Sequence, residues 1–485
     1  ESVLYDLNLL LTGGRLSPVS LDTVRRAFHD GLVGQQVKSA LGAIMMTPEF
    51  NTLGEPMPLT ARREEGSASV FQRTQPYKAV VLLWLAGGAD TWNLIVPQEC
   101  GLYQEYVDMR TDIAMTPGEL LQISTSGQNC SKFGIHASLP FLKELYDVGE
   151  ASFITNIGGI VQPTTMETYR GGAQRCFGLF SHNDQTNGAQ TLQCQFMGTG
   201  AMGVGGRIAD ALSAGTHQMR TSSFSMSGAA TWSQGFQVKR ESVAGIDDGV
   251  TDYEYWRGTI RNVTSVQHAN VYANAYTQLF LDSVETMENT ARVVSNAELL
   301  TNHPTNTGLA RQFEQVAKLV SSQEGRQAER DFFYVAIGGW DMHSNLKMGL
   351  VSRFGEINGA LQGFVAEMRA QSVWNNVVVM SESEFARTLD SNGGGSDHAW
   401  AGNHFVIGGG LSGGKVLNRY PESVAAGNHR DLGRGRMVPE FPWESMVVPI
   451  AQWLGVDSDS LVTAFPNLHL FGNEDIISLD AMFSV

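Results

Sequence analysis

Four apolar runs of strand length, each leading into a turn, constrain the fold of this chain more than any other feature. The first is Ala79-Val-Val-Leu-Leu-Trp-Leu85, followed by Gly87-Gly-Ala-Asp90. The others are residues 153–157, 332–337 and 377–380. Their hydrophobicity is continuous rather than alternating, which predicts strands buried on both faces, as in a parallel sheet covered by helices.

Helical patterns lie between these runs, over residues 139–145, 271–294 and 354–368. The repeated order of strand, glycine turn and helix predicts an α/β fold: a doubly wound, mostly parallel sheet with helices on both faces. In such sheets, functional sites form in the crevice beyond the carboxyl ends of the strands.

The first residues of the chain predict a separate helical segment. Leu4, Leu7, Leu10 and Leu11 recur at helical spacing, and a later helical stretch ends at Met46. The expected organisation is a helical appendage over 1–50, a polar linker over 51–76 and an α/β domain over 77–485. Because the chain begins inside a helical pattern, we expect Glu1 to be a processing point in a longer precursor.

The composition narrows the functional classes. The formal net charge is -16, and no local basic patch offsets it. Such a chain would repel a phosphate backbone and anionic membrane surfaces, which disfavours nucleic-acid binding. No apolar run approaches the roughly 20 residues needed to cross a bilayer, so no transmembrane segment is expected.

The four cysteines indicate an oxidising compartment. They are Cys100, Cys130, Cys176 and Cys194, and none lies in a CxxC motif. An even, clustered set predicts disulfides; we favour pairing of neighbours, with free buried thiols as the alternative. Glycosylation sequons begin at Asn129 and Asn262, and together these features favour a secreted or cell-surface glycoprotein.

Acidic and histidine residues follow three of the predicted strands. Asp90 follows the first, Asp341 and His343 follow the third, and Glu384 follows the fourth. Since the carboxyl ends of parallel strands share one edge, we expect these side chains to converge. An aspartate after a strand can instead cap the next helix, but the repetition favours a common site.

A further pair, Asp397-His398, follows the glycine-rich loop 392–395, whose backbone can approach an anion closely. His404 begins another apolar run, and we interpret it as a residue that supports the ligands, with a place in the core as the alternative. Divalent metals need several such oxygen and nitrogen ligands together, and hydrolytic sites keep one position open. The sequence therefore predicts a divalent metal site for zinc, calcium or magnesium.

Six motifs resemble those of domain-of-unknown-function family 1501. They are Leu85-Ala-Gly-Gly-Ala-Asp90, Phe180-Ser-His-Asn-Asp-Gln185, Gly205-Gly-Arg-Ile-Ala-Asp210, Gly338-Gly-Trp-Asp-Met-His-Ser344, Ser383-Glu-Phe-Ala-Arg-Thr388 and Asn392-Gly-Gly-Gly-Ser-Asp-His-Ala-Trp400. They occur in the family's order from residue 77 onward. That family resembles the alkaline phosphatase and sulfatase superfamily, so the resemblance implies an alkaline phosphatase-like domain.

The N-terminal segment has a resemblance of its own. Asn8-Leu-Leu-Leu-Thr-Gly-Gly-Arg-Leu-Ser17 and Ala43-Ile-Met-Met-Thr-Pro-Glu-Phe50 look like the carboxyl-terminal end of domain-of-unknown-function family 1800, which commonly accompanies the first family. The alternative is a chance match, because short leucine-rich helices resemble segments of many families.

The superfamily resemblance implies roles for individual residues. Asp90 would ligate one metal, and Ser181 would be the nucleophile that lies against this metal. His182 and Asp184 are alternatives to Ser181 in the same motif. A serine at the start of a helix can instead cap that helix. The other metal would be held by Asp341, His343 and His398, with Asp397 beside them.

Two further positions matter for catalysis. Arg387 would bind an anionic substrate through its planar guanidinium, with an ion pair as the alternative. Glu384-Phe385 stands where the superfamily has Asp-His, so a nitrogen ligand is missing and the second metal is expected to be weak or absent.

These features predict an extracellular metal-dependent hydrolase of phosphate or sulfate esters, acting on an anionic ester. The alternative is a catalytically inactive structural or binding protein that retains the sulfatase-like fold. Such a protein would bind an extracellular carbohydrate or protein, or assemble into an oligomer.

Overall fold

The chain forms two compact units in the computed structural model. Unit 1 comprises Glu1–Phe71 and Gly245–Asn296, and unit 2 comprises Gln72–Ala244 and Ala297–Val485. The structure describes residues 2–63, 73–197, 202–216, 218–243 and 246–484. None of the helices in these ranges is long and apolar enough to span a membrane.

Unit 1 is helical with one small sheet. Its elements are α1 (Ser2–Thr12), α2 (Pro18–Asp30), α3 (Gln36–Met45), α4 (Pro48–Asn51), α10 (Ile246–Thr264), α11 (Val271–Asn296), and the antiparallel pair β1 (Pro58–Arg62) and β9 (Val266–His268). Val24, Ala40 and Ile44 form its core, and Trp256 of α10 packs against them. The Tyr276 hydroxyl of α11 donates to the Met46 carbonyl at 3.1 Å.

The domain boundaries therefore differ from those expected. The predicted helix over 271–294 is α11, and it belongs with α10 to unit 1, together with the N-terminal helices. Part of the segment interpreted as a linker, 51–76, forms β1; residues 64–72 lie outside the described residues. A helical pattern reports which face is apolar, but it does not report which partner covers that face.

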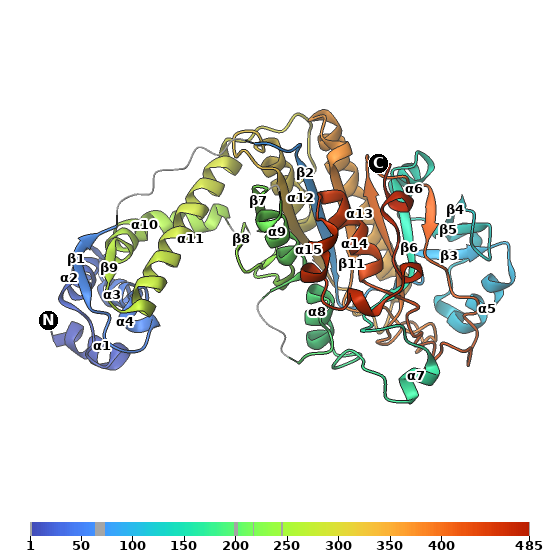
Figure 1. The fold of residues 1–485 in the computed structure, drawn as a ribbon, viewed down its shortest axis with the longest axis horizontal. Helices are drawn as coiled ribbons and strands as arrows, with labels where there is room; N and C mark the ends of the chain where they lie inside the picture. Colours follow the sequence, from blue (N-terminus) through green and yellow to red (C-terminus); the bar gives the residue numbers. More distant parts are fainter. Residues whose placement is uncertain (1, 64–72, 198–201, 217, 244–245, 485) are drawn as a thin grey trace. The chain divides into compact units, whose positions relative to one another are not determined.

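Unit 2 is built around a nine-stranded sheet (Figure 1). In spatial order its strands are β13 (Lys415–Leu417), β6 (Ala151–Gly158), β12 (Gly402–Gly408), β11 (Val377–Glu382), β2 (Lys78–Ala86), β10 (Arg330–Gly338), β7 (Thr221–Ser225) and β8 (Arg240–Ser242), with β14 (Phe441–Pro442) beside β6. Only β12 runs antiparallel to its neighbours in the described sheet. The predicted mostly parallel α/β fold is confirmed.

Helices cover both faces of this sheet (Figure 1). Val80, Leu82 and Trp84 alternate along β2 and share a core with α9 (Val204–Ala214) and α14 (Glu444–Leu454). On the other face lie α12 (Gly308–Ser321) and α13 (Leu346–Ala370). Burial from both sides explains why the strand sequences are continuously apolar.

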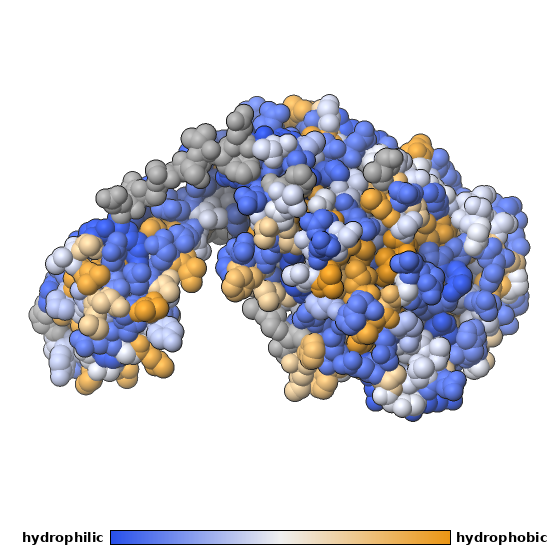
Figure 2. Space-filling view, viewed as in Figure 1, coloured by the Kyte–Doolittle hydropathy of each residue, from blue (hydrophilic) through white to orange (hydrophobic). Residues whose placement is uncertain are grey.

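The remaining elements of unit 2 surround this core. They are β3 (Ile95–Gln98), α5 (Gly101–Arg110), β4 (Leu120–Ser124), β5 (Lys132–His136), α6 (Pro140–Asp147), α7 (Met166–Arg170), α8 (His182–Thr191), α15 (Ser458–Ala464) and α16 (Leu479–Met482). Strands β3, β5 and β4 form a separate antiparallel sheet. Polar and charged side chains cover much of the visible face of unit 2 (Figure 2).

Two disulfides stabilise unit 2. Cys100 pairs with Cys130, and Cys176 pairs with Cys194, so the expected pairing of neighbours is confirmed. Bonds of this kind persist in oxidising compartments and indicate that the protein folds outside a reducing cytosol.

Candidate metal centre

Three side chains from distant parts of unit 2 meet beyond the carboxyl ends of the central strands. His182 begins α8, Asp341 follows β10, and His398 lies in the loop between β11 and β12. One ligand atom from each lies within 4.8 Å of the others. The Nε2 atoms of the two histidines are 3.1 Å apart, and Asp341 oxygens lie 3.2 Å from His398 Nε2 and 3.5 Å from His182 Nε2.

The hydrogen-bond partners assign the tautomers of both histidines. His398 Nδ1 faces the Phe180 carbonyl at 2.8 Å, and His182 Nδ1 faces the Glu384 carboxylate at 2.8 Å. Both partners can only accept, so each Nδ1 carries a proton, and Nε2 is the ring nitrogen available to a metal ion. The two Nε2 atoms and the Asp341 carboxylate therefore face one another, an arrangement that a cation, either a proton or a metal ion, stabilises.

The dimensions of this cluster suit a divalent ion. With zinc–nitrogen bonds of about 2.0–2.1 Å, ligand atoms of a tetrahedral site lie roughly 3.3 Å apart. The two Nε2 atoms are 3.1 Å apart, and Asp341 lies 3.2 Å from His398 through Oδ1 and 3.5 Å from His182 through Oδ2. A proton on His182 Nε2 would face both His398 Nε2 at 3.1 Å and an Asp341 oxygen at 3.5 Å, whereas a divalent ion would bind all three side chains. Asp341 is 45% exposed and His182 33%, so the cluster is accessible from solvent.

The loops after the central strands converge because the strands are parallel neighbours. Gly87, just beyond β2, has φ +125°, and an added Cβ would lie 2.7 Å from the Asp341 backbone nitrogen. Only glycine permits this approach of the two loops. The Gly87 amide also donates to Glu384 at 2.9 Å, which ties the loop after β2 to the one after β11.

Glu384 supports a ligand instead of joining the cluster as one. Its Oε1 accepts from both His182 Nδ1 and Gly87, and Oε2 accepts from the Ser383 hydroxyl at 3.1 Å. A carboxylate behind a ligating imidazole fixes the ring's orientation and tautomer. The structure thus brings Glu384 to the site, as expected, but in a different role.

The Arg387 guanidinium makes its hydrogen bonds within the protein. Its side chain is fully buried, Nη1 donates to Asp341 at 2.6 Å, and Nη2 donates to the Ser396 carbonyl. Although partial burial acts to raise it, the Arg387 hydrogen bond and charge hold the pKa of Asp341 below its ordinary value. A guanidinium held in this way positions Asp341 and is not available to bind a substrate. Arg387 therefore forms an ion pair, which was the alternative to substrate binding.

His343 and Asp397 lie beside the cluster. His343 bridges two carboxylates, with Nε2 at 2.9 Å from Asp341 and Nδ1 at 2.9 Å from Asp397. Despite partial burial, hydrogen bonds from Arg434, His343 and Asn392 lower the pKa of Asp397 to about 2. Both predicted ligands are close to the centre, but their polar atoms already have partners.

Asp90 lies apart from the cluster. It is buried and forms an ion pair with the fully buried Arg110 of α5, and it also accepts from the Ser396 hydroxyl at 3.4 Å. No local sequence pattern marks Arg110, whose charge compensates this carboxylate. The geometry therefore joins Asp90 to a buried ion pair and not to the three ligand atoms.

Ser181 and His182 stand together at the start of α8. Ser181 occupies the N-cap position, but its hydroxyl makes no capping hydrogen bond, so the capping interpretation does not describe it. His182 is a candidate ligand that the sequence indicated only as an alternative nucleophile. The available signal was an imidazole in a motif that already contained a candidate site residue.

His404 lies in the core, as the alternative interpretation had it. It is buried against the Trp443 ring, with its Nδ1 3.4 Å from the Ser381 hydroxyl. Burial lowers the pKa of His404 to about 3, which keeps the ring neutral.

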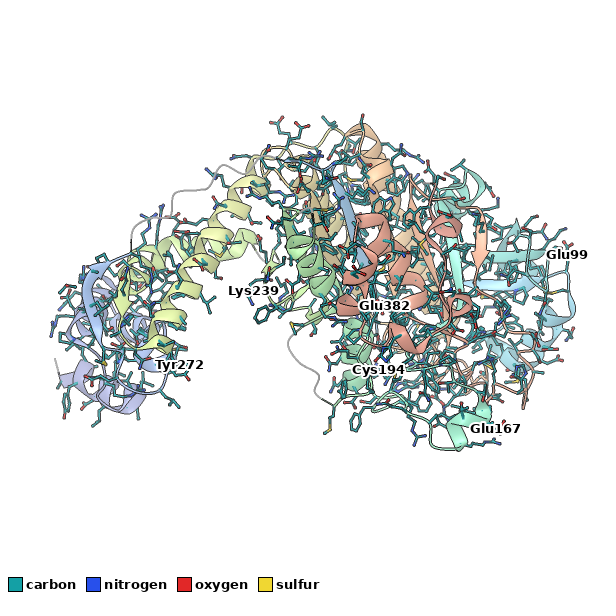
Figure 3. All side chains as sticks on the ribbon, in the orientation of Figure 1. Glu99, Glu167, Cys194, Lys239, Tyr272 and Glu382 are labelled. Carbon is teal, nitrogen blue, oxygen red and sulfur yellow. A yellow bond between two sulfur atoms is a disulfide. The ribbon has the colours of Figure 1, made fainter. Side chains whose placement is uncertain are left out.

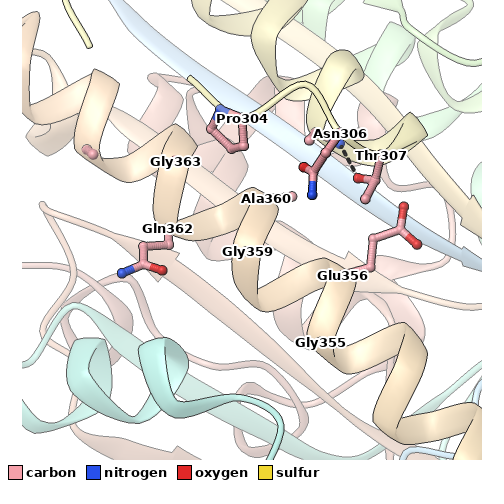
Figure 4. A pocket seen from close by; sticks show the side chains of 11 residues that line it. Pro304, Asn306, Thr307, Gly355, Glu356, Gly359, Ala360, Gln362 and Gly363 are labelled. Atoms are coloured by element: carbon pink, nitrogen blue, oxygen red, sulfur yellow. Dashed lines mark hydrogen bonds between the residues drawn. The ribbon is translucent and has the colours of Figure 1, made fainter. Parts of the chain in front are cut away.

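A separate hollow of about 430 Å³ lies beside α13 (Figure 4). Gly363 is required there, because an added Cβ would lie 2.3 Å from Pro304 Cδ, whereas Gly355 and Gly359 face open space. Among the described lining residues Glu356 is the only titratable group, so this hollow offers no comparable ligand set.

Comparison with known proteins gives one family match. Residues 266–465 match the model of the family described as "Protein of unknown function (DUF1501)", which confirms the resemblance inferred from the motifs. No curated protein matches the chain. The resemblance of the N-terminal segment to family 1800 stays a prediction.

Several solved structures are similar to this chain. The lipoteichoic acid synthase LtaP from Listeria monocytogenes has 6% identity and a TM-score of 0.31, over 79% of this chain and 72% of that one. The PsFucS1 sulfatase from Pseudoalteromonas sp. has 10% identity and a TM-score of 0.33, over 84% and 76%. Alkaline phosphatase from the Antarctic bacterium TAB5 has 12% identity and a TM-score of 0.25, over 70% and 92%.

Proposed function

We propose that unit 2 is a metal-dependent hydrolase of phosphate or sulfate esters. The observation that carries this proposal is the convergence of two imidazole Nε2 atoms and a carboxylate from His182, His398 and Asp341. These three residues would hold one divalent ion, and the exposure of Asp341 leaves room for a substrate oxygen. Closed structural sites, by contrast, use all their positions for protein ligands.

The ion would supply a Lewis acid at the ester group. We assign Ser181 as the nucleophile because it precedes His182 and its hydroxyl makes no capping bond. The Ser181 oxygen would displace the alcohol from phosphorus or sulfur, and water would then release phosphate or sulfate and restore the serine. Glu384 and Arg387 would act as positioning residues, holding His182 and Asp341 respectively.

The proposed setting is extracellular or at the cell surface. The two disulfides support it, and the exposed Asn129 would be available for glycosylation there. The proposed substrate is an anionic ester.

The test combines metal analysis with hydrolysis assays. The purified chain should contain close to one equivalent of zinc, calcium or magnesium and should hydrolyse 4-nitrophenyl phosphate or 4-nitrophenyl sulfate. His182→Ala should lose both metal and activity, whereas His469→Ala, which alters an exposed histidine near the C-terminus, should keep both. Protein without stoichiometric metal, or equal activity in the two variants, would refute the proposal.

The second candidate is a binding protein that has lost the chemistry. Asp90 is paired with Arg110, and Glu384 is hydrogen-bonded to His182, so the described residues offer one cation position and not two. This favours the second candidate. Stoichiometric metal without turnover of either ester would support this candidate.

A further inference from the structure

A second hollow, which we call the loop pocket, lies beside the metal centre. It measures about 430 Å³ and is lined by residues 175–180 together with Tyr169 and Gln195. The disulfide Cys176–Cys194 closes this segment against the chain beyond α8. Figure 3 labels Cys194 and, on α7, Glu167, which mark the two sides of the segment.

The wall of the loop pocket continues directly into the metal centre. Phe180 lines the pocket, and its carbonyl accepts the His398 Nδ1 proton at 2.8 Å. The next two residues are Ser181 and His182. Phe180 has φ +72°, a conformation that costs a residue with a side chain of the order of 1 kcal/mol and persists only where the surroundings impose it. The loop pocket and the candidate metal ligands are therefore parts of one continuous site.

Two arginines flank this pocket without carboxylate partners. The Arg175 guanidinium stacks on Tyr169, 4.9 Å from the ring centroid, and that of Arg436 stacks on Phe180 at 5.2 Å. Arg436 Nε donates to the His398 carbonyl at 3.1 Å. Within the described part of the chain, neither arginine forms an ion pair, although the protein has 49 acidic and 33 basic residues. A stacked guanidinium keeps its in-plane N–H groups available for an anion.

Aromatic side chains supply the other half of the surface. Tyr169 and Phe177 line the pocket, and Phe177 is 43% exposed. Tyr169 is supported from behind by the Trp400 ring at 5.9 Å. Rigid, partly exposed rings offer apolar contact area at small entropic cost, and the volume lies within the 300–1,000 Å³ range of small-ligand pockets.

We propose that the loop pocket is a specificity subsite for an acidic saccharide. In this proposal, which rests on the proposed function, the scissile ester lies at the metal centre. The neighbouring sugar unit packs on Phe177, and its sulfate or carboxylate accepts hydrogen bonds from Arg175, which Tyr169 holds in place. The planar guanidinium suits either anion, since both present two oxygens to its fork.

The test measures binding by the full chain with calorimetry, which requires no turnover. The probes are a chondroitin 4-sulfate tetrasaccharide, the unsulfated chondroitin tetrasaccharide, which keeps its carboxylates, and the neutral cellotetraose. The acidic probes should bind and cellotetraose should not; the difference between the two acidic probes separates sulfate from carboxylate recognition. Arg175→Ala should weaken binding roughly 10- to 100-fold, the effect of one or two charge-assisted hydrogen bonds.

The matched control is Arg170→Ala, which removes an exposed arginine at the end of α7 that does not line the pocket. It should bind the acidic probes as the unaltered protein does. Equal binding by Arg175→Ala, equal affinity for cellotetraose, or no binding of either acidic probe would overturn the subsite. Hydrolysis of 4-nitrophenyl esters by the unaltered protein tests the proposed function separately, so failure of one can be distinguished from failure of the other.

Discussion

Replacing Glu384 by glutamine should weaken metal binding without altering the shape of the site. The Glu384 carboxylate is buried and accepts from His182 Nδ1 at 2.8 Å and from Gly87 at 2.9 Å. A glutamine carbonyl can keep both hydrogen bonds, but it removes the negative charge that makes His182 Nε2 a stronger ligand. The loss of such a supporting carboxylate typically costs about 10- to 100-fold in metal affinity, or about 1.4–2.7 kcal/mol.

The assay is a zinc titration of metal-free protein against a chromogenic chelator. Glu382→Gln is the matched control. Glu382, which is labelled in Figure 3, lies two residues earlier. It is fully buried, and both its oxygens lack a hydrogen-bond partner among the described residues. Burial, reinforced by Glu444, holds the pKa of Glu382 well above its ordinary value, so the amide replaces a neutral acid. Unchanged affinity in Glu384→Gln, or an equal loss in both variants, would refute the role assigned to Glu384.

Three further predictions concern stability and the site loops. Replacing Cys176 and Cys194 together by serine removes a link across 18 residues, which should lower the free energy of unfolding by about 3 kcal/mol in urea denaturation; an unchanged midpoint would contradict this. Since the pKa of Asp397 is lowered to about 2, its contribution to stability is present above the ordinary value of about 3.9 and is lost as the pH falls toward 2. The stability difference between the unaltered protein and Asp397→Asn should therefore shrink over that range, and a constant difference would argue against the assignment. Gly87→Ala places a Cβ 2.7 Å from the Asp341 backbone nitrogen. Thermal unfolding should therefore show a free energy of unfolding lower by about 1–3 kcal/mol, and zinc titration should show weaker metal binding. An alanine variant that equals the unaltered protein in both measurements would contradict the close approach of the two loops.

The local sequence was sufficient to predict the strands and their environment. The runs over 79–85, 153–157, 332–337 and 377–380 are all strands of the large sheet, because continuous hydrophobicity directly reports burial on both faces. The parallel order of these strands then places Asp341 and Glu384 at one edge of the sheet. The disulfide pairing was also accessible, since each bond joins cysteines that are neighbours in the sequence.

Only the tertiary structure decided which polar side chains bind one another. His182 and His398 are 216 residues apart, and no local pattern indicates that their Nε2 atoms meet. The Asp90 carboxylate looked like a ligand until the fold placed the buried Arg110 against it. The same limit applies to the predicted helix over 271–294, whose partners in unit 1 no local pattern indicates. Hydrophobic periodicity is a local property of the chain, whereas the pairing of charges and lone pairs depends on the loops that the whole fold brings together.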